Sequence, residues 1–119
     1  MVDAVLTFLP PTEGGRPNLN LRLSGLSYRP HIVVGDQTQR RALLSPDKRS
    51  AEAMCGVAFA AGPSQIEPNV AYPATMMLMY WPHPIYDSVV PGATFTLREG
   101  AAIVGFGEIS RRWVQDALP

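Results

Sequence analysis

The chain has 119 residues, of which 46% are hydrophobic and 17% are charged, and its ten basic and ten acidic side chains cancel. This length predicts one domain, since domains usually hold roughly 100–200 residues, and the low charge argues against disorder. A net charge of zero excludes the global positive field of a general nucleic-acid or membrane-surface binder.

Cysteine content and the N-terminal residues indicate the cellular setting. Cys55 is the single cysteine, which excludes an internal disulfide and a multi-cysteine zinc site. The first residues lack the basic and apolar regions of a secretory signal, and no run reaches the roughly 18 apolar residues of a membrane span. We therefore expect a cytoplasmic protein without membrane attachment, with Cys55 buried and unreactive.

Proline content favours a β protein. Twelve prolines are spread over the chain, and each fixes φ, lacks an amide hydrogen and interrupts a helix. Apolar, β-branched and aromatic residues group in short runs between them, which predicts an all-β domain with frequent turns.

Seven segments have the composition or alternation of a strand. They are residues 2–9, 19–23, 28–35, 54–60, 74–81, 93–99 and 103–110. The first is apolar on both faces, and the second alternates leucine with polar residues. Pro30 is expected at the start or at an edge of the third strand. Gly105 and Gly107 share one face of the last, which indicates a bend or a close approach of another backbone.

The segment at 36–52 has no strand character and predicts a long loop. Within it, Ser45 and Pro46 have the chemistry of a helix start, so we expect at most a short helical turn near 46–52. At the other end of the chain, residues 111–118 either continue the last strand or form a helical turn.

The sequence offers no support for catalysis or for a cofactor. It contains no G-x-S-x-G elbow and no phosphate-binding G-x-x-x-x-G-K-[ST] loop. His31 and His83 have no supporting cysteine pair, so we interpret them as ordinary barrel residues rather than metal ligands. We expect a non-enzymatic protein with no catalytic residue, no metal, no cofactor and no bound nucleotide.

Five short motifs follow one another along most of the chain. They are Glu13-Gly14-Gly15-Arg16, Tyr28-Arg29-Pro30-His31, His83-Pro84-Ile85, Phe95-Thr96-Leu97-Arg98-Glu99-Gly100 and Val104-Gly105-Phe106-Gly107. In this order and spacing the chain resembles the C-terminal β-barrel domain (domain III) of translation elongation factor Tu. The resemblance implies a standalone elongation-factor-Tu-like domain, folded as a six-stranded antiparallel closed β-barrel. The chain has room for neither the GTPase domain nor the second barrel of that factor.

The resemblance also implies binding surfaces, because in that family the domain contacts the tRNA backbone and docks protein partners that include the nucleotide-exchange factor. The positions that match RNA-contacting ones are Arg16, Arg29, Glu99 and Gly100. Ala101 and Ala102 stand where the family has a glycine and an arginine, which removes a cation that would meet a phosphate. As a structural alternative, Arg29 pairs with Glu99 and joins two strands.

A methionine-rich segment is the second candidate surface. It contains Met76, Met77, Met79 and Trp81. A barrel wall that faces water usually alternates apolar and polar residues, and methionines give an adaptable surface typical of promiscuous interfaces. We expect another protein or a second copy of the chain to cover this segment; the alternative is that the loop at 37–52 folds over it.

Two functions stay open at this stage. The first is a protein-interaction module, favoured by the neutral charge and the methionine-rich segment. The second is a translation-related RNA-binding protein, favoured by Arg16, Arg29 and the basic residues of the long loop.

Overall fold

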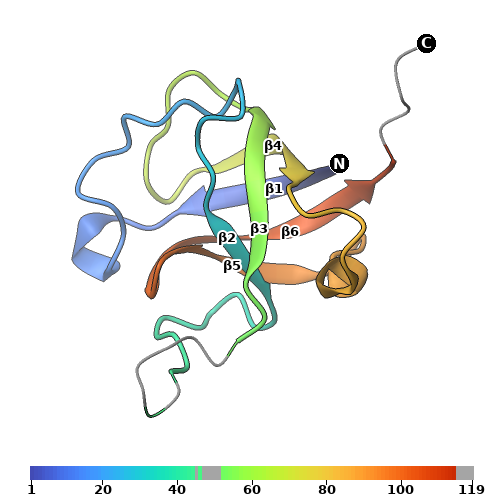
Figure 1. The fold of residues 1–119 in the computed structure, drawn as a ribbon. Helices are drawn as coiled ribbons and strands as arrows, with labels where there is room; N and C mark the ends of the chain where they lie inside the picture. The colour runs from blue at the N-terminus through green and yellow to red at the C-terminus, as the bar shows by residue number, and fades with distance from the viewer. Residues whose placement is uncertain (45, 47–51, 115–119) are drawn as a thin grey trace.

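The computed structural model describes residues 1–44, 46 and 52–114, which form a β-barrel with two short 3₁₀-helices (Figure 1). The strands are β1 (Val2–Phe8), β2 (His31–Val34), β3 (Cys55–Ala61), β4 (Ala71–Leu78), β5 (Thr94–Glu99) and β6 (Ala102–Arg112), and the 3₁₀-helices are η1 (Pro11–Glu13) and η2 (Pro84–Ser88). All neighbouring strands are antiparallel and close in the order β1-β4-β3-β2-β5-β6. The predicted six-stranded antiparallel closed barrel is therefore confirmed.

The core lies inside the barrel and is built from strand residues that alternate inward and outward. In β1 the inward side chains are fully buried, whereas Val5 points outward and is 46% exposed. Phe59, Met76 and Phe95 fill the interior from three other strands. The burial of β1 thus alternates residue by residue although both of its faces are largely apolar, since successive side chains in a strand point to opposite faces.

Gly105 and Gly107 allow two strands to approach closely, as the sequence predicted. They pair with Phe8 and Leu6 of β1. A Cβ atom on Gly105 would lie 2.7 Å from the carbonyl oxygen of Thr7, a distance that side chains do not tolerate. Glycine at these inward positions therefore lets β6 pass over β1 with the large core side chains in place.

The predicted strand at 19–23 is wrong, because this segment is a loop. Its alternation is nevertheless real, since Leu23 is fully buried and Leu19 and Leu21 pack against the core. The leucines thus follow the burial of side chains and not a ladder of backbone hydrogen bonds. Pro30 immediately precedes β2, as predicted.

Strand β4 is shifted toward the N-terminus relative to the prediction of 74–81. It begins at Ala71 and includes Pro73, where it pairs with β1. Its pairing with β3 reaches only Thr75, so at Pro73 strand β4 is paired with β1 alone. The missing amide hydrogen of Pro73 therefore interrupts no hydrogen bonding with β3. Residues 79–81 form a turn after the strand.

The last strand continues to Arg112, so the helical alternative for residues 111 and 112 is wrong. Beyond it, the amide of Trp113 donates to the carbonyl of Met1 at 3.0 Å, which joins the residue before β1 to the residue after β6. The predicted helical turn near 46–52 falls mainly on residues 47–51, which lie outside the described residues. No helix in the described part of the chain is long and apolar enough to cross a membrane.

Candidate functional site

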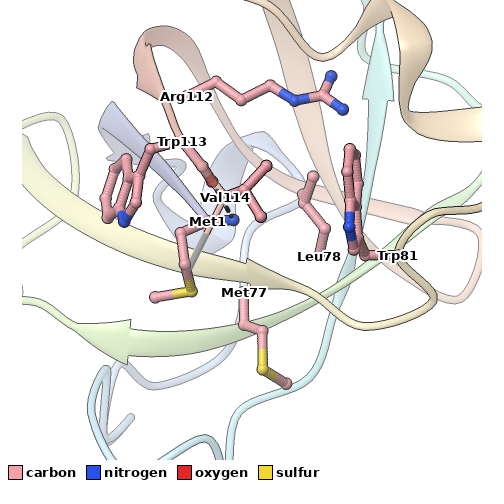
Figure 2. Close-up of a pocket in the computed structure, with 7 residues that line it drawn as sticks. All are labelled: Met1, Met77, Leu78, Trp81, Arg112, Trp113 and Val114. Carbon is pink, nitrogen blue, oxygen red and sulfur yellow. Dashed lines mark hydrogen bonds between the residues drawn. The ribbon is translucent and has the colours of Figure 1, made fainter. Parts of the chain in front are cut away.

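A concave surface at one end of the barrel brings together the turn after β4 and the end of β6 (Figure 2). It has a volume of about 250 Å³ and is lined by Met1, Met77, Leu78, Trp81, Arg112, Trp113 and Val114. We call it the tryptophan groove, because Trp81 and Trp113 stand on its two sides, with Leu78 and Val114 between them (Figure 2). Trp81 is 47% exposed and Val114 is 64% exposed, so the groove presents large apolar side chains to the surface.

The Trp81 side of the groove is held by a buried tyrosine. The Tyr86 hydroxyl donates to the carbonyl of Gly56 at 2.7 Å and accepts from the amide of Tyr80 at 2.9 Å. Burial raises the pKa of Tyr86, which keeps the hydroxyl protonated as a donor. The turn that carries Trp81 is thereby joined to β3.

The Trp113 side is held by the pairing of the first and last strands. The terminal amine of Met1 donates to the carbonyl of Trp113 at 3.1 Å, and burial lowers the pKa of that amine. The guanidinium carbon of Arg111 lies 4.2 Å from the centre of the Trp113 ring. This contact is a cation–π interaction, which favours an ordered indole at the surface.

Arg112 connects the two sides. Its Nη1 donates to the carbonyls of Tyr86 and Val89 at 2.7 and 3.0 Å, and its guanidinium carbon lies 4.9 Å from the centre of the Trp81 ring. None of the residues that line the groove is acidic. The groove is therefore an apolar surface with a cation on its rim.

The four predicted interface residues lie in different environments in the structure. Met77 and Trp81 line the tryptophan groove. Met76 points into the barrel and is fully buried, so its assignment to a contact surface is wrong, and Met79 is half-buried beyond the lining residues. The alternative was that the long loop folds over the methionine-rich segment. The described part of that loop instead contacts β5 and β6, where Arg40 lies over the Phe106 ring.

Arg16 and Glu99, two of the predicted RNA-contacting residues, bind each other. Arg16 Nη1 lies 2.6 Å from Glu99 Oε2, and the Tyr28 hydroxyl donates to the same oxygen at 2.6 Å. Burial and the neighbouring carboxylate raise the pKa of Tyr28, whose ring stacks on Phe59 at 5.4 Å between centroids. This Glu99 cluster of Arg16, Tyr28 and Glu99 joins the loop before β2 to the end of β5. The sequence did not predict that Tyr28 would bind Glu99.

Arg29 and Gly100 lie apart from that cluster. Arg29 is exposed and its Nε donates to the carbonyl of Leu26 at 2.8 Å, so the alternative pairing of Arg29 with Glu99 is wrong. Gly100 occupies the exposed turn between β5 and β6 with a φ of 59°, a left-handed conformation that favours glycine. Ala101 and Ala102 beside it are exposed.

Sequence reasoning also missed a buried ion pair. Arg98 alternates with the inward Leu97 and therefore points away from the barrel interior, yet it is fully buried. Glu52 covers it, with Arg98 Nη1 and Nη2 bound to the two carboxylate oxygens at 2.8 and 3.0 Å. Hydrogen bonds from Arg98 lower the pKa of Glu52 to about 2. Distance in sequence hides such a pair, because Glu52 lies in a loop without a periodic pattern.

Within the described residues no group of three His, Cys, Asp or Glu side chains lies close enough to hold a metal. Cys55 is buried as predicted, and burial raises the pKa of its thiol. The fold and the groove define a class: a small closed antiparallel β-barrel with an apolar, cation-rimmed groove at one end. Comparisons of the chain with protein-family models, with curated proteins and with solved structures found no match.

Proposed function

We propose that this protein is a non-enzymatic protein-interaction module that binds its partner through the tryptophan groove. The observation that carries the proposal is the pair of tryptophans on either side of one concave apolar surface, with the guanidinium of Arg112 over the Trp81 ring. Tryptophan, arginine and methionine are enriched in protein interfaces, and tryptophan and arginine dominate the residues with large binding energies.

The size and chemistry of the groove support a protein ligand. Its volume of about 250 Å³ is below the roughly 300–1,000 Å³ of sites that enclose a cofactor or a drug-sized ligand. Its walls are indole, thioether and aliphatic side chains, which gain free energy when water is removed from them. A groove of this kind fits one bulky side chain of a partner protein.

The chain is further proposed to be a freestanding relative of the elongation-factor-Tu C-terminal barrel. This kinship rests on the five ordered motifs, since a six-stranded barrel occurs in many families. It makes docking of a protein partner the inherited property that the groove would have kept or altered.

A capture experiment tests the proposed function. The chain is immobilised through a biotin on Ser64→Cys, an exposed position in the loop between β3 and β4, while the native Cys55 is buried. Native lysate is passed over wild type and over Trp81→Ala, each in RNase-treated and untreated halves. We expect a defined protein to bind wild type in both halves and to be lost with Trp81→Ala.

A matched control separates the groove from general stickiness. Tyr80→Ala removes another aromatic side chain that is 62% exposed but does not line the groove. It should capture the same protein as wild type. Equal capture by wild type and Trp81→Ala would contradict binding through the groove.

RNA-backbone binding is the second candidate, favoured by the exposed Arg29 and the open turn at Gly100. Against it, the charge of Arg16 is paired with Glu99, and Ala101 and Ala102 supply no cation. Phosphate contacts weaken steeply with salt. Recovery of tRNA that is lost after RNase treatment, falls between 50 and 200 mM salt and is reduced by Arg29→Ala would favour this second function.

A further inference from the structure

We infer that the tryptophan groove selects an acidic, apolar peptide segment, in which a bulky apolar side chain stands next to a carboxylate. This inference rests on the proposed function and specifies its ligand. It is carried by three features of the described residues: the size of the groove, the charge on its rim and the hydrogen-bond donors that Arg112 has left for a ligand.

The size of the groove sets the apolar part of the ligand. A volume of about 250 Å³ corresponds to about eight water molecules at roughly 30 Å³ each. That space holds one leucine or phenylalanine side chain with part of its backbone. Trp81 and Trp113 would contact it from the two sides (Figure 2), with Leu78 beneath it.

The charge on the rim sets the polar part. Arg111 and Arg112 follow each other at the end of β6, and each guanidinium lies over one of the two tryptophan rings. Arg111 Nε lies 3.6 Å from Oδ2 of Asp3 in an exposed pair. Exposed pairs of this length contribute little to stability. The positive charge at the groove itself is that of Arg112, because the lining residues include no acidic side chain.

Arg112 has donors to spare for a ligand. Its Nη1 is used by the carbonyls of Tyr86 and Val89, whereas its Nε and Nη2 have no hydrogen-bond partner among the residues that the structure describes. A guanidinium offers five N–H donors in a planar fork that matches a carboxylate. Because Nη1 is fixed by two backbone carbonyls, this fork is held in place before a ligand arrives.

The same groove is a poor track for nucleic acid. Nonspecific binding of a strand combines a line of cations along the backbone with successive stacked bases, whereas here one arginine, Arg112, lines a single hollow. The net charge of zero adds no long-range attraction. The chemistry therefore favours a peptide over RNA.

The two tryptophans report binding directly, because they are the only tryptophans in the chain and both line the groove. Acetylated, amidated tetrapeptides without tryptophan are titrated against wild-type protein by intrinsic fluorescence. The probes are Glu-Leu-Phe-Glu, its lysine counterpart Lys-Leu-Phe-Lys, and Glu-Ser-Ser-Glu. We expect a saturable change with the first and at least tenfold weaker binding of the other two.

Two variants assign the charge preference. Arg112→Gln should reduce the preference for the acidic peptide at least fivefold, and Arg29→Gln, an exposed arginine outside the groove, should leave it unchanged. Because Arg112 also holds two carbonyls, circular dichroism checks its fold. If that variant is unfolded, Arg111→Gln provides the test, with an expected loss of at least twofold.

Three results would overturn the inference. They are equal binding of the acidic and the lysine peptide, no saturable change with any peptide, and tighter binding of an oligouridylate than of the acidic peptide. A fluorescence change on concentrating the protein alone would instead identify a second copy as the occupant. If the peptide titration fails while capture from lysate still depends on Trp81, the proposed function stands and only this inference is contradicted. If capture does not depend on Trp81, both the proposed function and this inference are contradicted.

Discussion

Tyr86 joins the turn that carries Trp81 to strand β3 through a single hydroxyl group. The hydroxyl is buried and serves two backbone groups, an amide and a carbonyl. A buried backbone group without a partner costs roughly 1–3 kcal/mol. This tyrosine therefore stabilises the barrel and places one wall of the groove at the same time.

Tyr86→Phe is the corresponding prediction at the residue scale. Removing the hydroxyl should lower the free energy of unfolding by about 1–3 kcal/mol and weaken partner capture, since the Trp81 turn loses its link. Urea denaturation followed by circular dichroism measures the first effect. The same change at the exposed Tyr80 should shift stability by less than about 0.5 kcal/mol, and equal losses for both variants would contradict the assigned role.

Gly107 gives a second prediction at this scale. A Cβ there would meet the carbonyl oxygen of Val5 and lie 2.7 Å from Cζ of Phe95. Gly107→Ala should therefore destabilise the protein by about 1–3 kcal/mol through overpacking. Ser110→Thr adds one methyl group to an exposed position of the same strand and should be nearly neutral in the same urea titration. A Gly107→Ala protein as stable as wild type would show that β1 and β6 can separate at no cost.

At the scale of elements, a buried ion pair between Glu52 and Arg98 joins the end of the long loop to the barrel. Glu52 covers Arg98 on the outer side of β5, and it also accepts from the Leu43 amide and from Gln39 Nε2. A buried pair of charges contributes modestly as a whole, but removing one partner leaves the other uncompensated. Glu52 thus connects Gln39 and Leu43 of the described loop to β5.

Glu52→Gln should consequently destabilise the protein by about 3 kcal/mol. The double variant with Arg98→Met should recover much of that loss, because it removes the orphaned guanidinium. Urea midpoints at pH 7 for wild type, both single variants and the double variant form the thermodynamic cycle. Additive losses in the double variant would mean that Glu52 and Arg98 stabilise the fold independently.

The strands could be predicted from the local sequence pattern wherever the residues with buried side chains also form backbone hydrogen bonds with a neighbouring strand. Prolines and alternation indicated all six strands, and the glycines of β6 indicated a bend or a close approach of another backbone, which the structure identifies as β1. The pattern at Leu19, Leu21 and Leu23 misled because a loop across a core buries alternate side chains just as a strand does. The local sequence pattern indicates which side chains are buried, but it does not indicate whether the backbone pairs with a neighbouring strand.

The groove was predictable only in part, for a related reason. Trp81 and Met77 were visible as an apolar excess in one segment. Trp113 and Arg112 come from the other end of the chain, and they reach the groove only because β1 closes the barrel between β4 and β6.

At the scale of the whole molecule, the titratable groups define a range of pH in which the barrel is most stable. The pKa of Glu52 is about 2 when folded, below the ordinary 4.5, so its stabilisation is complete above pH 4.5 and is lost as pH falls toward 2. Tyr28 and Cys55 have pKa values raised from 10.0 and 9.0, so their stabilisation is complete below those values and is lost as pH rises above them.

We therefore expect the urea midpoint to be highest between about pH 5 and 9 and to fall on both sides. Denaturation at pH 3, 7 and 10.5 measures the profile. Glu52→Gln should flatten the acid side, and Tyr28→Phe should flatten part of the alkaline side. An acid side that keeps its slope in Glu52→Gln would assign it to other carboxylates.

The bridge between Met1 and Trp113 has a consequence for anything joined to this barrel. Met1 and Trp113 both line the tryptophan groove, so a segment joined to the amine of Met1 emerges beside the hollow. A short flexible tether would hold it there at an effective concentration in the millimolar range. Even a weak ligand would then occupy the groove in most molecules, so covalent attachment could convert an open docking surface into a self-occupied one.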